Sequence, residues 1–322
     1  MKIVKSVRDI YADCVPRYEL LETEVKQILK PLAEDRGWFF VSRLKGLESF
    51  ALKIETGRVS VPHSMEDFFA CTIVVPTLSQ IEQAEELILA SYDHSQRRPQ
   101  NDSVTHKASS SFAFDDLRLY VSRRPLASGK NSELDGMVFE IQIKTVLQHA
   151  WSVATHDLIY KSNTVSWPLE RIAFQVKAML EHAEVAIAEA NRLADAPAVS
   201  RRDHKTVGTL LLIEHIRNIW SSDRLPADIK RLAETIFSVI KTCDLEPEDF
   251  QELIMSEKLR LGVLPTDLSP YAFTVQALAH KQDLDFEHKI SRRHIRNTVV
   301  IHSGMTLPAW MLVEHPKILN LG

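Results

Sequence analysis

The sequence predicts an α+β fold, in which a small mixed β-sheet with flanking helices is followed by a mainly helical C-terminal domain. Four runs have the apolar or alternating character of strands, at residues 38–41, 68–75, 112–121 and 138–143. From Thr145 onward the hydrophobic pattern is almost entirely helical. Only 9 of 322 residues are glycine, below the usual share of about 7%, which favours a helix-rich chain.

The first part is expected to contain three helices and a polar loop besides its strands. Residues 7–34 carry apolar side chains at helical spacing, and Pro16 and Pro31 are expected to break or bound that helix. The polar segment 93–111 is expected to be a loop. Helices are also expected over residues 47–54 and 81–90, the second with Ser79 as N-cap.

The second part begins near a change in composition. Pro168 suits the first turn of a helix that continues to about Ala196. Residues 195–203 are the expected boundary, which gives domains 1–198 and 199–322. Beyond it, helices are expected near 204–221, 226–242, 247–261 and 268–281, and a short strand over 297–302.

Composition limits the class of protein. The hydrophobic share of 45% and charged share of 25% are those of a globular protein with a real core. A net charge of −4 gives no overall basic field for nucleic acid. Three scattered cysteines, no signal core and no apolar run of about 18 residues predict a cytoplasmic protein without a membrane partner.

Two acids stand where strands are expected. Asp67 precedes the apolar run FFACTIVV, and Glu140 lies in the alternating run VFEIQIK, where it shares a face with Gln142 and Lys144. Two carboxylates from neighbouring strands make a natural Mg²⁺ site, because that ion takes one or two carboxylates together with substrate phosphates. Taken singly, an acid such as Asp67 is more often a turn residue, and one such as Glu140 is usually part of a solvated face.

Cations cluster upstream of these acids. Ser49 and Lys53 are four residues apart on one face of the helix expected over 47–54, and Arg43 and Lys45 precede them. Such groups can hold a polyphosphate chain, although surface lysines and arginines are a common alternative. There is no P-loop, no GxGxxG and no zinc spacing.

The helix after the strand at 138–143 has two different stripes. One stripe is polar, and the opposite one is apolar and expected to pack in the core. The polar stripe holds His149, His156 and Tyr160, and the apolar one Leu147, Trp151 and Leu158.

The order RLKGLESFALK, EDFFACTIVV, FEIQIKTVLQHAWSVATHDLIYK resembles the synthetase domain of the RelA/SpoT alarmone-synthetase family, over roughly residues 20–195. The resemblance implies a nucleotidyltransferase-like mixed sheet. It also implies transfer of the β,γ-pyrophosphate of ATP to the 3′-hydroxyl of a guanosine nucleotide, or, in a toxin branch, to the 3′ end of tRNA.

Carried over by position, the resemblance implies roles for individual residues. Asp67 and Glu140 would bind Mg²⁺, and Glu140 would also help to deprotonate the attacking hydroxyl. The ATP side would be Arg43, Lys45, Ser49, Lys53 and Lys144, and the acceptor side Phe114, Arg118, Gln142, His149, His156 and Tyr160.

The chain departs from the family pattern mainly on the acceptor side. Thr72 stands in place of an arginine that stacks on adenine, and Phe114 in place of a tyrosine. Asp115 replaces an arginine and Arg118 a histidine. The negative charge of Asp115 would repel a polyphosphate that an arginine would attract. An acceptor without a 5′-triphosphate therefore fits this sequence better than GTP does.

Three hypotheses follow: a synthetase of (p)ppGpp, a toxin that pyrophosphorylates tRNA, and a non-catalytic regulatory module. Residues 199–322 carry no readable motif, and a protein trigger or an antitoxin is a candidate partner there. The basic segment 287–297 is either an RNA contact or a solvated helix face.

Overall fold

The structure is a computed structural model that describes residues 2–57, 59, 61–101, 116–124, 132–159, 166–292 and 298–321, with only the backbone for 156–159. The chain divides into two compact units, residues 1–199 and 200–322. In the described part of the chain, no helix combines the length and the apolar character that a membrane span requires.

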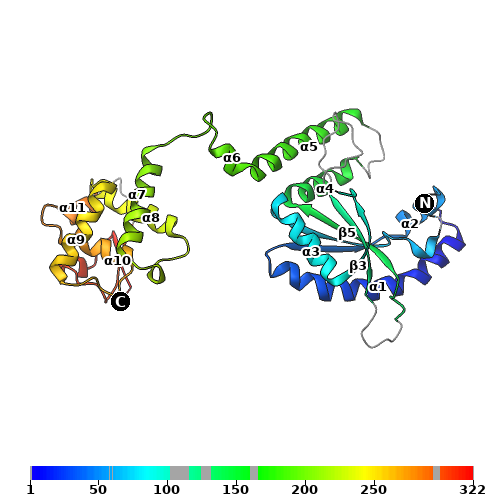
Figure 1. Ribbon diagram of the computed structural model, residues 1–322, viewed down its shortest axis with the longest axis horizontal. Helices are drawn as coiled ribbons and strands as arrows, with labels where there is room; N and C mark the ends of the chain where they lie inside the picture. The colour runs from blue at the N-terminus through cyan, green and yellow to red at the C-terminus, as the bar shows by residue number, and fades with distance from the viewer. Residues whose placement is uncertain are drawn as a thin grey trace. The chain divides into compact units, whose positions relative to one another are not determined.

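The first unit is built on a five-stranded mixed sheet (Figure 1). Its strand order is β1-β2-β5-β4-β3, with β2 and β5 parallel and the other neighbours antiparallel. The α+β prediction is therefore confirmed. The strands are β1 (Phe39–Leu44), β2 (Phe69–Val75), β3 (Tyr92–Arg98), β4 (Leu117–Arg123) and β5 (Val138–Thr145).

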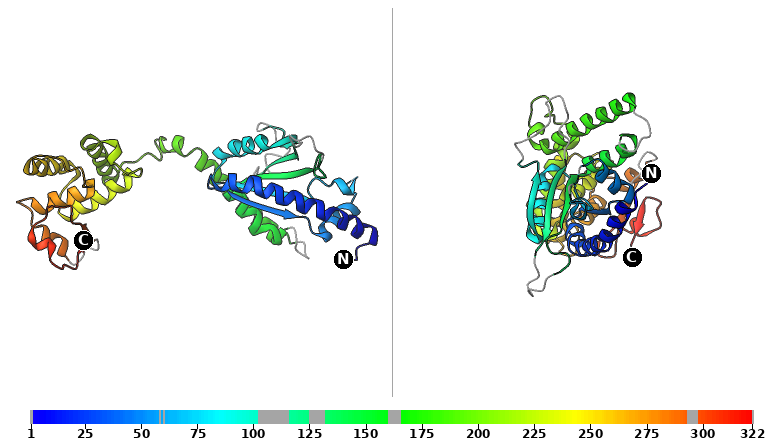
Figure 2. Two further views of the ribbon diagram at one scale, coloured as in Figure 1. Left: turned by 90° about the horizontal axis from the view of Figure 1, so that it is seen from below. Right: turned by 90° about the vertical axis from the view of Figure 1, so that its right-hand side faces the viewer.

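Some helices of this unit cover the apolar face of the sheet, and others follow β5 in the chain. Figure 2 shows the long helix α1 running along the sheet. The helices of this unit are α1 (Lys5–Glu34), α2 (Leu47–Glu55), α3 (Ile81–Ser91), α4 (Val146–Ile159), α5 (Trp167–Ala188) and α6 (Ala190–Ala194), with 3₁₀ turns η1 (Pro62–Ser64) and η2 (Leu78–Gln80).

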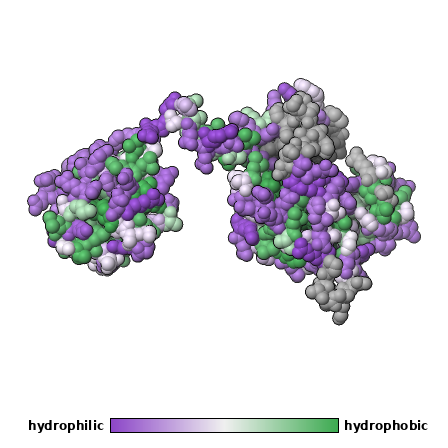
Figure 3. Space-filling model, in the orientation of Figure 1, coloured by the Kyte–Doolittle hydropathy of each residue, from purple (hydrophilic) through white to green (hydrophobic). Residues whose placement is uncertain are grey.

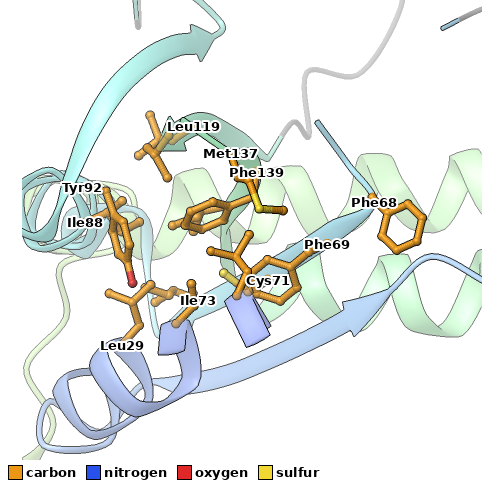
Figure 4. Close-up of a cluster of buried hydrophobic side chains, with 14 of the residues drawn as sticks. Leu29, Phe68, Phe69, Cys71, Ile73, Ile88, Tyr92, Leu119, Met137 and Phe139 are labelled. Carbon is orange, nitrogen blue, oxygen red and sulfur yellow. The ribbon is translucent and has the colours of Figure 1, made fainter. Parts of the chain in front are cut away.

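The core of the first unit lies between that face and the helices α1 and α3. Alternate residues of the strands point into it because successive side chains of a strand lie on opposite faces. Figure 4 shows Leu29 of α1 and Ile88 of α3 gathered with Phe69 of β2 and Phe139 of β5. The opposite face of the sheet is thereby left for polar side chains.

The prediction that prolines interrupt the first helix is wrong. The helix α1 is continuous through Pro16 and Pro31. Each proline removes one helical hydrogen bond, but both lie on the exposed side, where nearby carbonyls can turn to water. The opposite stripe, buried along the whole helix, keeps the backbone helical: Val7, Cys14, Tyr18, Leu21, Val25, Leu29 and Ala33.

Two further local predictions are corrected. Ser79 lies in the 3₁₀ turn η2 and pairs with the Thr77 hydroxyl at 2.9 Å, while Gln80 is the N-cap residue of α3. Residues 93–98 of the expected polar loop belong to β3, an edge strand paired with β4. A polar strand was missed because an edge strand with only Tyr92 fully buried has little apolar alternation.

The second unit is mainly helical, as expected. Its helices α7, α8, α9 and α10 pack around one apolar core that also contains the short parallel pair β6 and β7. The elements are α7 (His204–Ile219), η3 (Ser222–Arg224), α8 (Ile229–Thr242), η4 (Pro247–Asp249), α9 (Phe250–Leu261), α10 (Pro270–His280), α11 (Phe286–Ser291), β6 (Val299–Ile301), η5 (Ala309–Leu312) and β7 (Ile318–Asn320).

The surfaces of both units mix hydrophilic and hydrophobic residues on the face shown in Figure 3.

The basic segment 287–297 is partly described. Lys289 and Arg292 both bind the carboxylate of Asp244, at 2.5 Å and 2.8 Å. These two cations therefore serve an ion pair on the surface of the second unit, and residues 293–297 lie outside the described part.

Gly208 of α7 lies close to side chains of α8 and of the 3₁₀ turn η4. A Cβ atom there would lie 2.5 Å from Phe237 Cε2 and 2.7 Å from Pro247 Cγ. We expect Gly208→Ala to lower the stability of this unit by roughly 1 kcal/mol, because overpacking costs about 2 kcal/mol, the middle of its usual range, and helix propensity returns about 1 kcal/mol. Thermal melts would check it, and an unchanged or higher Tm would show that Phe237 moves aside freely.

Candidate active site

The polar face of the sheet is organised around β5, its middle strand. Phe139, Ile141 and Ile143 enter the core, so Glu140, Gln142 and Lys144 lie on the opposite face. This alternation is the one that the sequence predicts. Because β5 pairs with β2 on one side and β4 on the other, residues from both neighbours can reach the same face.

Glu140 is a buried carboxylate held by donors on both of its oxygens. Only 4% of the residue is exposed. The Tyr120 hydroxyl donates to Oε2 at 2.9 Å, and the Gln142 side-chain amide donates to Oε1. The Arg118 Nη1 atom lies 3.8 Å from Oε2. Burial, followed by the charge of Glu140, raises the pKa of Tyr120 to about 12, so this hydroxyl keeps its proton at neutral pH.

Asp67 lies just before β2 and is bound by two lysines. Its Oδ2 atom is 2.6 Å from Lys53 Nζ and 3.0 Å from Lys45 Nζ. Lys45 follows β1, where its backbone N–H donates to Phe68 O and its own carbonyl accepts from the Tyr11 hydroxyl. Asp67 thus connects the segment after β1, the helix α2 and the start of β2.

The charge balance at Asp67 determines its ionisation. Burial raises the pKa of Asp67, but hydrogen bonds and charges from Lys53 and Lys45 outweigh burial, and the pKa lies below its usual value. A carboxyl whose pKa is lowered by folding stabilises the protein above the unfolded pKa, and this stabilisation is lost as pH falls through the folded pKa.

We therefore expect thermal stability to fall as pH drops below about 4, near the unfolded pKa of an aspartate. Asp67→Asn should lower the Tm at pH 7, and its difference from the wild type should shrink at acid pH as the native carboxyl is protonated. Tm measured between pH 7 and pH 3 checks this expectation, and a difference that is constant with pH would contradict it.

A second ionic cluster lies at the β4 side of Glu140. Asp116 Oδ2 is 3.3 Å from Arg118 Nε and 3.6 Å from Lys144 Nζ. Burial lowers the pKa of Lys144, the charges of Arg118 and Arg43 lower it further, and Asp116 opposes them. Asp116 therefore forms ion pairs with both Arg118 and Lys144, two cations for which the family resemblance implies substrate binding.

The other predicted residues lie in different surroundings. Arg43 is exposed at the end of β1 and lies close enough to Lys144 to influence its pKa. Ser49 is exposed on α2. His149 is half-buried in α4, where burial and then the charge of Lys144 lower its pKa. Phe114 and Tyr160, and the side chain of His156, lie outside the described residues.

Trp151 of α4 is half-buried and is not among the residues of the buried core, where the apolar stripe was expected to pack. The Trp151 indole N–H donates to Ala173 O of α5 at 3.1 Å. At the end of β5, the Thr145 hydroxyl donates to the buried carboxylate of Glu184, also on α5. These contacts attach α5 to the strand that carries Glu140.

Three residues at this face were not predicted: Tyr120, Asp116 and Arg98. The Arg98 guanidinium lies 4.7 Å from the centroid of the Tyr120 ring. The signal that could have found Tyr120 is its alternation with Leu119 and Val121, which are core residues. Nothing in the sequence shows that Tyr120 and Glu140 face each other, because strand register is a tertiary property.

The donor atoms present are compatible with Mg²⁺. Asp67 Oδ1 is buried and has no hydrogen-bond partner among the described residues, so it has lone pairs to offer. Glu140 on the polar face is the second carboxylate that the sequence proposes for the ion. In the described ranges, no group of three or more His, Cys, Asp or Glu side chains forms a metal cage. The set suits an ion that takes one or two carboxylates and completes its shell with substrate oxygens.

Part of the chain matches a known protein family. Residues 42–165 match the family described as "Region found in RelA / SpoT proteins". The chain contains a RelA/SpoT region. This region includes Asp67, Glu140 and every other predicted site residue. The resemblance noted in the sequence is thus confirmed, and no curated protein matches the chain.

The chain is also similar to several solved structures. Small alarmone synthetase 1 from Bacillus subtilis, bound to its product pppGpp, is 18% identical, with 59% of this chain and 100% of that one covered and a TM-score of 0.46. Small alarmone synthetase 2 from Bacillus subtilis is 14% identical, with 57% and 99% covered and a TM-score of 0.45. The complex of the Type VI effector Tas1 with its immunity protein gives 15% identity, 73% and 94% coverage and a TM-score of 0.30.

Proposed function

We propose that the RelA/SpoT region transfers the β,γ-pyrophosphate of ATP to the 3′-hydroxyl of GTP or GDP, which gives (p)ppGpp. The observation that carries the proposal is the buried Glu140 carboxylate on the polar face, with Arg118 3.8 Å away and Asp67 binding two further cations at the start of the adjacent strand β2. The family match over residues 42–165 supports it.

The chemistry needs a proton acceptor and neutralisation of phosphate charge. Glu140 would accept the proton of the attacking 3′-hydroxyl, which a carboxylate within hydrogen-bond reach can do. Arg43, Lys45, Lys53 and Lys144 would orient the triphosphate of ATP and offset its charge, the main contributions in phosphoryl-type transfer. Mg²⁺, when bound through Asp67 and Glu140, would supply further charge neutralisation at the phosphates.

The 3′ end of tRNA is a second candidate acceptor, and Asp116 favours it. Asp116 forms ion pairs with both Arg118 and Lys144. The pair with Arg118 takes up positive charge that a 5′-triphosphate would need on the acceptor side. A terminal nucleoside of tRNA carries no 5′-triphosphate, so it requires less positive charge at this place.

One labelling experiment separates the acceptors. The purified full chain is incubated with Mg²⁺ and ATP labelled at its β-phosphate, in the presence of GTP, GDP and bulk tRNA together. Label in a guanosine product supports the proposal, and label only in tRNA supports the second candidate. No transfer to any acceptor would leave the third hypothesis, a non-catalytic module. The role of residues 199–322, including a protein trigger or an antitoxin, stays a prediction.

A further inference from the structure

Tyr120 is the closest neighbour of Glu140 that no motif points to. In the antiparallel register of β4 and β5 these two residues are direct partners. Only 5% of Tyr120 is exposed, and its hydroxyl donates to Glu140 Oε2 at 2.9 Å. The Arg98 guanidinium lies over the Tyr120 ring, 4.7 Å from the ring centroid, in a cation–π contact.

The Tyr120 hydroxyl is one of two side-chain donors that bind the Glu140 carboxylate. The Gln142 amide donates to Oε1 from the same strand, while Tyr120 donates to Oε2 from the neighbouring strand. One donor would leave the carboxylate free to rotate about its last torsion, whereas donors on both oxygens determine its plane. A carboxylate has about four acceptor positions, so two remain for a substrate proton or a cation.

The tyrosine ring is itself held in place. It is buried in the sheet, β3 pairs with β4 beside it, and Arg98 of β3 stacks on its face. Arg98 also donates to Gln96 at 2.9 Å, which orients the guanidinium along β3. The chain of contacts from β3 through Tyr120 to Glu140 is built on strands, which place a side chain more accurately than a loop does.

We propose that Tyr120 is a positioning residue, which holds the Glu140 carboxylate in the orientation that accepts the proton of the attacking hydroxyl. This inference rests on the proposed function. Since Tyr120 acts through Glu140, its hydroxyl should affect the rate of the chemical step, and not the binding of ATP at the lysines around Asp67.

Tyr120→Phe keeps the ring and removes only the hydroxyl. We expect kcat to fall about 10–100-fold, since small misplacements of a reacting group cost up to about 100-fold, with KM for ATP unchanged. Tyr92→Phe is the matched control, because Tyr92 is a buried tyrosine in the apolar core whose hydroxyl has no hydrogen-bond partner among the described residues. It should leave kcat and KM unaltered. A kcat of wild-type size in Tyr120→Phe would overturn the proposal.

A second measurement does not depend on catalysis. Thermal melts of Tyr120→Phe, Glu140→Ala and the double variant form a double-mutant cycle. Tyr120→Phe should lower the Tm of the wild type and have a much smaller effect in the Glu140→Ala background. Additive shifts would show that the hydroxyl does not hold the carboxylate. If the wild type transfers no label, the proposed function fails, while this cycle still decides whether Tyr120 holds Glu140.

Discussion

Glu140→Gln is expected to lower the rate of pyrophosphate transfer by about 1,000-fold, within the range of about 10²–10⁴ for the loss of a general base. The amide has the same size and keeps an oxygen that can accept from Tyr120 or Gln142, so the sheet should fold as before. Its nitrogen cannot take a proton from a hydroxyl, and the negative charge is lost. The measurement is label transfer from ATP under single-turnover conditions.

The matched control for this experiment is Glu86→Gln. Glu86 is an exposed acid on α3, the helix that covers the other face of the sheet. It should transfer label at the wild-type rate. If Glu140→Gln retained more than a tenth of the wild-type rate, Glu140 would not be the proton acceptor, and a different group on the polar face would have to be sought.

Glu257→Ala is expected to destabilise the second unit by about 3 kcal/mol, because it removes the centre of a buried polar network. Glu257 is 3% exposed and accepts two hydrogen bonds of 2.7 Å from Arg260. It also accepts from Gln276 Nε2 at 2.7 Å, and Gln276 Oε1 accepts from the Thr306 backbone N–H. The network therefore joins α9, α10 and the segment after β6.

The cost should come mainly from Gln276. Arg260 is 38% exposed and can turn to water once its partner is gone, whereas Gln276 is 1% exposed and would keep an unpaired amide in the core. A fall in Tm of about 10 °C is expected for a unit of this size. Gln251→Ala, at an exposed position on the same helix, should stay within about 0.5 kcal/mol of the wild type. Equal melts for the two variants would contradict the argument.

By itself, the sequence determined the fold class and the arrangement of β5. Its alternation predicts that Glu140, Gln142 and Lys144 share a face opposite the core residues, and the structure confirms this. The shift to a helical period after Thr145 likewise predicts α4. Both are local patterns, because side-chain direction in a strand or helix follows from the backbone period. The RelA/SpoT region could be recognised for the same reason, since its motifs are short and contiguous.

Only the tertiary structure decided what surrounds these residues. Tyr120 meets Glu140, and Asp116 meets Lys144, through pairing between strands about 20 to 30 positions apart, which no local period encodes. The helix α1 stays continuous through its prolines because one buried stripe along it packs against the sheet. The polar residues 92–98 form the strand β3 because their backbone pairs with β4 at the edge of the sheet. Each outcome depends on the free energy of packing or pairing with a distant partner, which outweighs the local preference of the residues involved.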